Sequence, residues 1–523
     1  MRKLLHGGTS QVLRLITGDI WLFGEPHTAV AFDENRIVAL DDEALKLGIT
    51  PEPLRGRFLT HAFMDGHAHP LFAGREQLGP DVTEAKSVTE IQQVVESWIE
   101  SHDSPLWAVG GAYDRSIVDG GLFKAEWLDE VSGDRPVVLH ASDHHTLWAN
   151  TAAMRLCGIE ESAPAVSVGS IDVDASNRPT GVFRETEAKE LITSKIPPLS
   201  LENELIALDW AQQTLASLGI SAVQDAWMEV GMVEAYLAAA EQGRLRVRTN
   251  LAFWVRPESW LEDTDKFSMQ RAQVEKLASP YLSAKTVKFF ADGVFGSATA
   301  AVKKPYESQP GYLGDPVWTN SELQASVAHF ARLGYQIHIH AIGDAGVASA
   351  LDAIELAGSP SNSVIAHTEL VADEDIARFA KLGVSANFEP LWAREDGMLT
   401  SCVHHLGRQR IDSMYRMRDL VDAGAKITFG SDWPVSSPDP ILGLFTATHR
   451  ALPESPSDAW TPEQRLTAQE ALYAYTEAVS AQLGLPADSS DFVVLSANPL
   501  TGNLLDLEVV ETIIGGQTVF ARQ

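Results

Sequence analysis

The chain has 523 residues, which is too long for one simple core and predicts a large domain with a smaller one beside it. Hydrophobic residues make up 45% and charged residues 21% of the chain, a globular balance that excludes wholesale disorder. The formal net charge of −31 repels phosphate backbones and anionic lipids, so we expect neither a nucleic-acid partner nor a membrane partner.

The cysteines and the start of the chain indicate the compartment. Cys157 and Cys402 form neither a metal-binding pair nor a disulfide framework, which fits a reducing cytoplasm. The first residues lack the apolar core of a signal peptide, and no apolar run approaches the roughly 20 residues that cross a bilayer. We therefore expect a cytoplasmic protein.

Short runs of apolar and β-branched residues, each ending at a polar or ionisable residue, predict eight strands. In chain order these runs are 57–69, 219–227, 248–255, 284–293, 334–344, 362–370, 383–390 and 425–434. Helical spacing with a terminal glycine occurs between the later runs, at 321–334, 373–383 and 417–424. Strands that alternate with helices predict a parallel sheet, and eight such units predict a closed barrel. The predicted fold class is therefore α/β, a (β/α)8 barrel of the TIM type.

Two parts of the chain interrupt this repeat. Residues from about 70 to 218 separate the first two predicted strands, a length that no ordinary loop reaches, so we expect a structured insertion. Within it, 136–142 is strand-like and 148–159 is helix-like. Short β-patterned runs in both end segments predict one small β-sandwich-like domain built from the two termini. The predicted boundaries are 1–58 and 478–523 for this domain and 59–477 for the barrel.

Histidines at the ends of the predicted strands indicate a metal site. His67 and His69 form an H-x-H pair, and residues two apart in a strand point to the same face, so both imidazoles can reach one ion. His340 ends the fifth predicted strand and His367 the sixth, and neighbouring strand ends meet in a barrel. Each histidine alone is more often structural or exposed. The four in this order favour a divalent metal, zinc above all.

An aspartate and a lysine extend this set. Asp432 ends the eighth predicted strand, which a closed barrel brings beside His67 and His69, so it can bind metal and accept a proton. Its alternative role is a helix cap or a turn. Lys288 lies in an apolar run, where an ammonium is costly. Carbamylation by carbon dioxide would make it a carboxylate that bridges two metals, and the alternative is an ion pair with Asp292.

With these residues in place, the chain resembles the amidohydrolase superfamily, and within it the amidohydrolase-3 branch that includes N-substituted formamide deformylase-like proteins. The segments that carry the resemblance are FMDGHAHP (63–70), SDHHTLWANTAAM (142–154), PTGVFRE (179–185), VKFFADGVFGSATA (287–300), HIHAIGDAG (338–346), IAHTEL (365–370), GSDWPV (430–435) and LTAQEALYAYT (466–476). They spread over nearly the whole chain in the family's order. The resemblance implies a metal-dependent hydrolase on a barrel.

The resemblance also implies roles for single residues. The implied metal ligands are His67, His69, Lys288, His340, His367 and Asp432. His338 lies two residues before His340 on the same strand face, and the HAIGD match favours His340. His145 matches the histidine of the family's D-x-H-x-x-W segment and is expected to act in catalysis, with a structural role as the alternative. The expected substrate-binding residues are Trp148, Asn150, Asp292, Phe295 and Trp392.

Together these features predict hydrolysis of a C–N bond in a small amide, N-formyl or N-acyl compound. A metal-activated water would attack, with Asp432 as the general base and one or two ions at the site. One alternative is a hydrolase of esters, lactones or cyclic amides on the same site. Another is a non-catalytic binding or regulatory protein that kept the fold, and it predicts the loss of ligand positions. All six positions are present. A homo-oligomer is an open alternative to a monomer.

Overall fold

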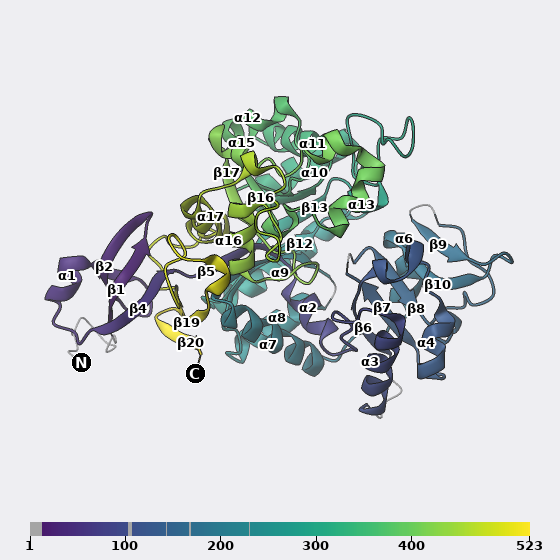
Figure 1. Ribbon diagram of the computed structural model, residues 1–523, viewed down its shortest axis with the longest axis horizontal. Helices are drawn as coiled ribbons and strands as arrows, with labels where there is room; N and C mark the ends of the chain where they lie inside the picture. Colours follow the sequence, from purple (N-terminus) through teal and green to yellow (C-terminus); the bar gives the residue numbers. More distant parts are fainter. Residues whose placement is uncertain (1–12, 103–106, 143, 167–168, 230, 523) are drawn as a thin grey trace. The chain divides into compact units, whose positions relative to one another are not determined.

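The structure of the protein is a computed structural model that describes residues 13–102, 107–142, 144–166, 169–229 and 231–522 (Figure 1). The chain forms two compact units. The barrel unit comprises residues up to 69, 212–433 and the residues from 437 onward. The insert unit comprises residues 70–211 and 434–436.

Eight parallel strands in the barrel unit form a nearly closed barrel. In order around the sheet they are β5 (Phe63–Ala68), β11 (Ile220–Met228), β12 (Arg248–Trp254), β13 (Leu282–Phe290), β14 (Gln336–Ala341), β15 (Val364–His367), β16 (Ser385–Phe388) and β17 (Lys426–Phe429). The backbone N–H groups of Ser431 and Asp432 donate to the carbonyl of His67 at 3.1 and 2.7 Å, which joins the end of β17 to β5. The predicted fold class is confirmed, and each predicted run overlaps one barrel strand; the run 57–69 also covers the end of β4 (Glu52–His61).

Helices follow most of these strands and pack on the barrel, such as α9 (Trp260–Leu277) against β13 and α11 (Asp344–Leu356) against β14. The helix α12 (Asp373–Leu382) shows why these segments are helical. Three acidic residues occupy its first turn, where the helix dipole favours negative charge. Gly383 then adopts a φ of 68°, the left-handed conformation that commonly ends a helix.

Alternation along the strands sorts the inward-facing side chains into layers. Near the amino-terminal ends, Asn250 donates to Gln224 and Thr286, at 2.7 Å each, and Thr286 donates to Gln336 at 2.6 Å. These polar side chains form a layer inside the barrel, and they satisfy one another's hydrogen-bonding groups without water. Two residues further along β13, Lys288 faces the interior, and it pairs in register with His338. The barrel therefore presents ionisable side chains towards its carboxyl end.

Strands from both ends of the described chain form one seven-stranded sheet in the barrel unit. Its order is β20 (Gln517–Ala521), β19 (Val509–Ile514), β18 (Phe492–Leu495), β4 (Glu52–His61), β1 (Arg14–Leu22), β2 (Glu25–Phe32) and β3 (Ile37–Leu40). The buried side chains of Ile20, Leu59 and Phe492 pack on one face. β4 pairs in parallel with β1 and antiparallel with β18, so the two ends of the chain share a single core.

The insert unit contains a five-stranded sheet. Its order is β6 (Ala108–Tyr113), β7 (Val137–Ala141), β8 (Thr146–Ala149), β10 (Pro179–Arg184) and β9 (Ser170–Val173). The helix predicted over 148–159 is wrong at its start. Residues 148 and 149 belong to β8, and the helix α5 spans only Thr151–Leu156. Asn150 sets this boundary, since its side chain accepts hydrogen bonds from the backbone N–H groups of Ala153 and Val137.

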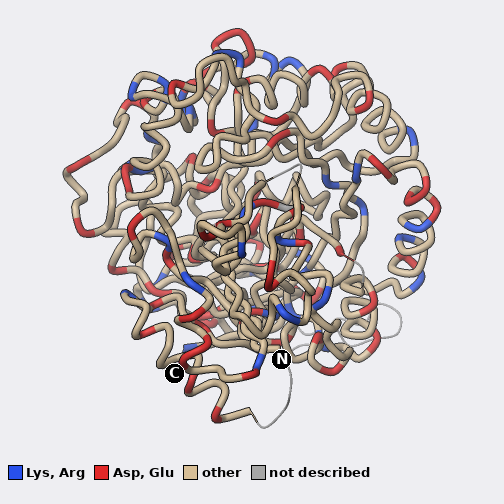
Figure 2. Tube along the Cα trace, turned by 90° about the vertical axis from the view of Figure 1, so that its right-hand side faces the viewer, with Lys and Arg blue, Asp and Glu red and all other residues tan. Residues whose placement is uncertain are grey.

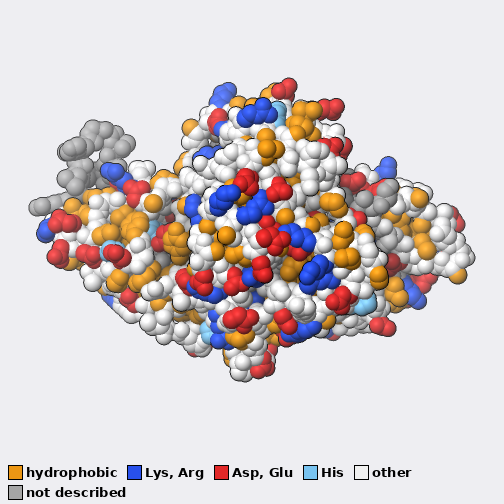
Figure 3. Space-filling view, turned by 90° about the horizontal axis from the view of Figure 1, so that it is seen from above, with side chains coloured by type: hydrophobic (Ala, Val, Ile, Leu, Met, Phe, Trp, Pro, Cys, Tyr) orange, Lys and Arg blue, Asp and Glu red, His pale blue; other side chains and the backbone are white. Residues whose placement is uncertain are grey.

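Charged side chains of both signs are interspersed along the chain (Figure 2) and over the face seen in Figure 3. Many of them form exposed ion pairs, such as Arg378 with Asp352 and Glu355. Within the described residues, no helix combines the length and the apolar composition that a membrane span requires.

Candidate metal centre

Three of the predicted ligands converge at the carboxyl end of β5. His67 and His69 lie on β5 and in the residue just after it, and both are buried. The Oδ1 atom of Asp432 lies 2.9 Å from Nε2 of His69 and 3.4 Å from Nε2 of His67. The donor atoms of the three residues all lie within 4.8 Å of one another, so one ion can contact all of them. The closure of the barrel at β17 produces this arrangement.

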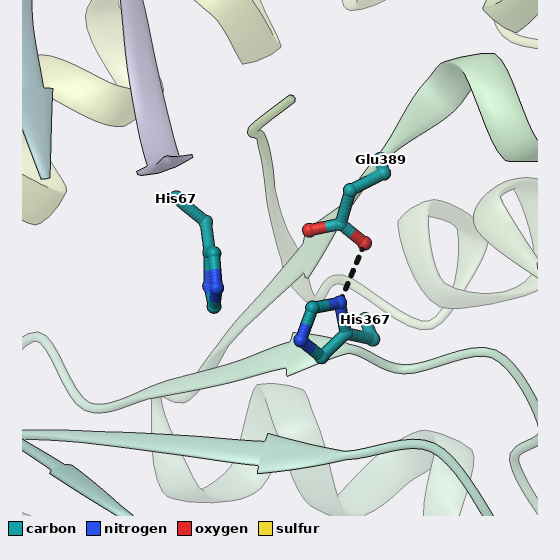
Figure 4. Close-up of side chains that lie close together, drawn as sticks. All are labelled: His67, His367 and Glu389. Atoms are coloured by element: carbon teal, nitrogen blue, oxygen red, sulfur yellow. Dashed lines mark hydrogen bonds and ion pairs between the residues drawn. The ribbon is translucent and has the colours of Figure 1, made fainter. Parts of the chain in front are cut away.

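A second group shares His67 and adds His367 and Glu389. Figure 4 shows the carboxylate of Glu389 facing the His367 ring, with His67 across from the pair. The Oε2 atom of Glu389 lies 3.0 Å from Nδ1 of His367, and the three donor atoms again lie within 4.8 Å of one another. Nδ1–H of His367 donates to the carboxylate, which leaves Nε2 to face a metal. Glu389 was missed in the sequence.

Burial and charge act in opposite directions on this pair. Burial raises the pKa of the Glu389 carboxyl above its usual value. For His367, burial works to lower the pKa, but the charge of Glu389 and its hydrogen bond outweigh burial, and the pKa is raised. The two groups therefore hold a proton between Nδ1 and Oε2, and this proton keeps the ring in the orientation that exposes Nε2.

His338 and Lys288 contact the two ring nitrogens of His67. Nδ1 of His67 lies 2.9 Å from Nε2 of His338, and Nε2 of His67 lies 3.2 Å from Nζ of Lys288. Burial lowers the pKa of the Lys288 ammonium to about 7, against the opposing charges of Asp432 and Glu389. Lys288 thus lies inside the candidate centre. The ion pair with Asp292, considered from sequence, does not occur.

Asp292 instead fixes loops at the mouth of the barrel. Its carboxylate accepts backbone N–H groups of Ala301, Ile342 and Gly343 at 2.8, 3.0 and 2.8 Å. The side chain is buried and its printed hydrogen bonds go to the backbone, so it has a structural role, and its contact with substrate is still a prediction. The nearest ligand candidate is His340, whose Nε2 lies 3.8 Å from Oδ1 of Asp292 and donates to the carbonyl of Gly293. The His340 ring lies 4.5 Å from the His367 ring, between centroids.

Two candidate ligands have unusual backbone conformations. His367 has a φ of 72° and Asp432 a φ of 54°, in the left-handed region that side chains other than glycine seldom adopt. The strand β17 ends at Phe429, before Asp432, so the predicted strand extended too far along the chain. Such conformations cost roughly 1–3 kcal/mol each and cluster at functional sites. Here they accompany His367 at the end of β15 and Asp432 just beyond β17.

The remaining predicted residues divide between the two units. Trp392 stacks on the His367 ring at 5.6 Å between centroids and 2° between planes, so it adjoins the centre, and its contact with substrate is still a prediction. Phe295 is buried at 3% exposure, and its assignment to substrate is still a prediction. Trp148 is fully buried in the core of the insert unit and Asn150 caps α5, so both have structural roles, and their contact with substrate is still a prediction. His145, also in the insert unit, pairs with Glu185 at 2.9 Å, and its catalytic role is still a prediction.

The chemistry of the donor set fits a divalent cation. Imidazole nitrogens and carboxylate oxygens are the ligands that zinc prefers outside thiolate sites. The Oε1 atom of Glu389 is buried and has no hydrogen-bond partner within the described part of the chain. A buried carboxylate oxygen without a partner is costly, and a cation would compensate it. The residues present therefore suit a metal.

We predict that His338 controls metal affinity through His67. If its Nε2 accepts the Nδ1 proton of His67, it keeps Nε2 of His67 free to coordinate. His338→Ala should weaken metal binding roughly 10–100-fold, the usual cost of losing such a partner. Titration with a metal-buffered indicator measures this. His329→Ala, on the helix α10 (Asn320–Arg332), is the control and should bind metal as the unchanged protein does. Equal affinity in both variants would contradict the assignment.

Comparisons with known proteins identify the family to which the chain belongs. The model of the amidohydrolase family matches residues 54–520. The chain is 28% identical over 490 residues to YtcJ of Bacillus subtilis (strain 168), a protein named as an amidohydrolase, and the match covers 90% of each chain. It is 24% identical over 506 residues to the N-substituted formamide deformylase of Arthrobacter pascens, covering 89% of each. A metal-dependent hydrolase from Pyrococcus horikoshii OT3 has the same fold, with a TM-score of 0.76 at 23% identity, over 95% of this chain and 99% of that one.

Proposed function

Because the chain belongs to the amidohydrolase family, we propose that it is a metal-dependent hydrolase that cleaves the C–N bond of a small amide, N-formyl or N-acyl compound. The observation that carries the proposal is the buried group of His67, His69 and Asp432, which lies at the carboxyl end of the barrel strands. Catalytic groups on this fold occupy that end. The N-substituted formamide deformylase among the relatives supports a C–N bond as the target.

The ligands of the ion would be His67, His69, His340, His367 and Asp432. A divalent ion such as zinc, when bound, would polarise a carbonyl and lower the pKa of a coordinated water to about 7. His67 and His69 are held on one face of β5, which orients their nitrogens before any ligand arrives. Glu389 fixes the ring of His367. These contacts preorganise the site on rigid strands instead of on loops.

In the proposed reaction Asp432 would move the proton. Burial works to raise the pKa of its carboxyl, but hydrogen bonds from His67 and His69 outweigh burial and hold the pKa well below its usual range. The carboxylate is therefore ionised and can accept a proton from the attacking water. The same carboxylate would return this proton to the leaving nitrogen, which must be protonated to depart as an amine.

A combined measurement tests the proposal. Elemental analysis of the purified protein would be paired with hydrolysis assays of formamides, acetamides and N-acyl amino acids, each beside its matched ester. We expect a bound divalent metal and faster hydrolysis of one amide class than of its ester. Turnover of esters alone would favour the esterase alternative. No turnover in metal-loaded protein, with all ligand positions present, would contradict the proposed function.

We further propose that Lys288 is carbamylated in the active protein. In this step the Lys288 ammonium first gives one proton to solvent. The neutral amine then forms an N–C bond with carbon dioxide and loses a second proton to solvent, so overall a cation becomes an anion beside His67. Protein prepared in ¹³C-bicarbonate should show a carbamate carbon resonance that Lys288→Ala abolishes. The variant should lose most activity, and short carboxylic acids should restore part of it. Lys285→Ala, on the same strand but exposed, is the control. An unmodified Lys288 in fully active protein would show that one ion suffices.

A further inference from the structure

Three aromatic side chains at the ends of β11, β12 and β13 form a group that we call the aromatic wall. It consists of Trp227, Trp254 and Phe290. The ring centroid of Trp227 lies 5.1 Å from that of Trp254 and 5.0 Å from that of Phe290. Each contact is edge-to-face, the geometry that aromatic pairs prefer. Three neighbouring strands thus contribute one large side chain each to a continuous apolar surface.

The aromatic wall adjoins the candidate metal centre on two sides. The Trp227 ring lies 6.1 Å from the His69 ring, and the Phe290 ring lies 5.0 Å from the His340 ring. Trp254 pairs in register with Lys288, and Phe290 with His340. Because residues in register on parallel strands face the same side, Trp254 and Phe290 face the interior, as these ionisable residues do. A molecule that reached the metal ligands would meet the wall.

Packing alone does not account for these positions. The neighbouring residues Phe253 and Phe289, which alternate with them, are fully buried and pack outward, Phe253 on Phe267 and Phe289 on Phe330. The three wall residues are only half-buried. Large aromatic surface left partly exposed beside a polar centre is the mark of a ligand-binding surface. The wall residues are therefore partly exposed apolar side chains at the carboxyl ends of these three strands.

The charges around the wall favour an uncharged ligand group. The guanidinium of Arg256 lies over the Trp254 ring at 5.5 Å from its centroid. This guanidinium already forms ion pairs with Asp263 at 3.5 Å and with Glu258 at 3.8 Å. On the inner side, the carboxylates of Asp432 and Glu389 would repel an acidic substituent. The complementary partner is a flat, apolar and uncharged group.

We propose that the aromatic wall selects substrates that carry an aryl group, so that the substrate is an aryl-bearing amide whose ring stacks on Trp227, Trp254 and Phe290 while its carbonyl reaches the metal ligands. This inference rests on the proposed function and names its substrate class. The wall residues are specificity determinants and take no part in proton transfer. Their contribution is to hold the ring, and through it the reacting bond, in place.

The test compares an aryl-bearing and an alkyl-bearing member of whichever amide class the enzyme hydrolyses. The unchanged enzyme should have the higher kcat/KM for the aryl compound. In Trp254→Leu and, separately, Phe290→Leu, the aryl-to-alkyl ratio of kcat/KM should fall roughly 10–100-fold, as expected when a pocket loses apolar contacts. Metal content should not change. Trp260→Leu, on the helix α9, is the matched control and should keep the ratio. Equal rates for both compounds in the unchanged enzyme, or an unchanged ratio in both wall variants, would overturn the inference.

A binding measurement separates this inference from the proposed function. Phenylacetamide and butyramide would be titrated into metal-loaded protein, with tryptophan fluorescence as the readout. Saturable binding of phenylacetamide alone, lost in Trp254→Leu but retained in Trp260→Leu, supports the wall even if no amide is hydrolysed. Equal binding of both amides, or binding of neither, overturns it while leaving C–N hydrolysis to be judged by the activity assays.

Discussion

Prolonged chelation should abolish hydrolysis, and zinc or manganese should restore it. Five predicted ligands converge from β5, from β14 and β15, and from the segment after β17, and without an ion nothing else among them polarises a carbonyl. The loss should be complete within the sensitivity of the assay, because the uncatalysed reaction of an amide with water is very slow. The measurement is the rate of amine release against the metal content of each sample.

The control for metal removal is a check that the metal-free protein is still folded. The barrel closes through backbone hydrogen bonds from Ser431 and Asp432 to His67, which need no ion. The metal-free protein should therefore keep its circular dichroism spectrum, and its melting temperature should rise when metal returns, since an ion that binds only the folded state stabilises it. Full activity in protein verified to be free of metal would rule out the proposed mechanism.

Asp432→Asn should lower kcat roughly 10²–10⁴-fold, the usual contribution of general acid–base help. The amide keeps the size and one oxygen of the carboxylate but cannot accept the proton of the attacking water at neutral pH. The other ligands should retain much of the metal. Stopped assays of amine release, normalised to bound metal, measure the effect.

The matched control for this variant is Asp352→Asn on the surface of α11. That carboxylate pairs with Arg378 and is not one of the candidate metal ligands, so the rate should stay unchanged. An Asp432→Asn variant with near-normal turnover per metal would show that another group moves the proton. Loss of metal in step with activity would instead make Asp432 a ligand first and a base second.

The barrel could be predicted from sequence because each of its strands carries two signals, an apolar run and a polar residue at the end of that run. Each predicted run is apolar where it is buried and stops at a polar residue where it reaches the carboxyl end, as in the segment that ends at His340. Strand-to-helix alternation then determines the topology. The insertion was harder. Trp148 and Ala149 look helical beside the true helix α5, and only pairing with β7 and β10 makes them a strand.

The candidate site was predictable where ligands lie on strands and less so where loops bring them in. His67, His69 and His340 follow from strand alternation and spacing. Glu389 was missed because it lies just beyond β16, although alternation from Asn387 places it on the inner face. The aromatic wall was also missed, since Trp254 and Phe290 look like ordinary strand residues until the register sets them beside Lys288 and His340.

The seven-stranded sheet has a consequence for biosynthesis. β4 is made early, yet its partner β18 follows more than 400 residues later. At a synthesis rate of about 5–20 residues per second, the edge of β4 waits roughly 20–90 seconds for its neighbour. Such an open edge invites pairing between nascent chains. Pro53, Arg55 and Arg57 are exposed on β4 just before the segment that β18 will cover, and residues of these types discourage edge-to-edge association while the ribosome finishes the chain.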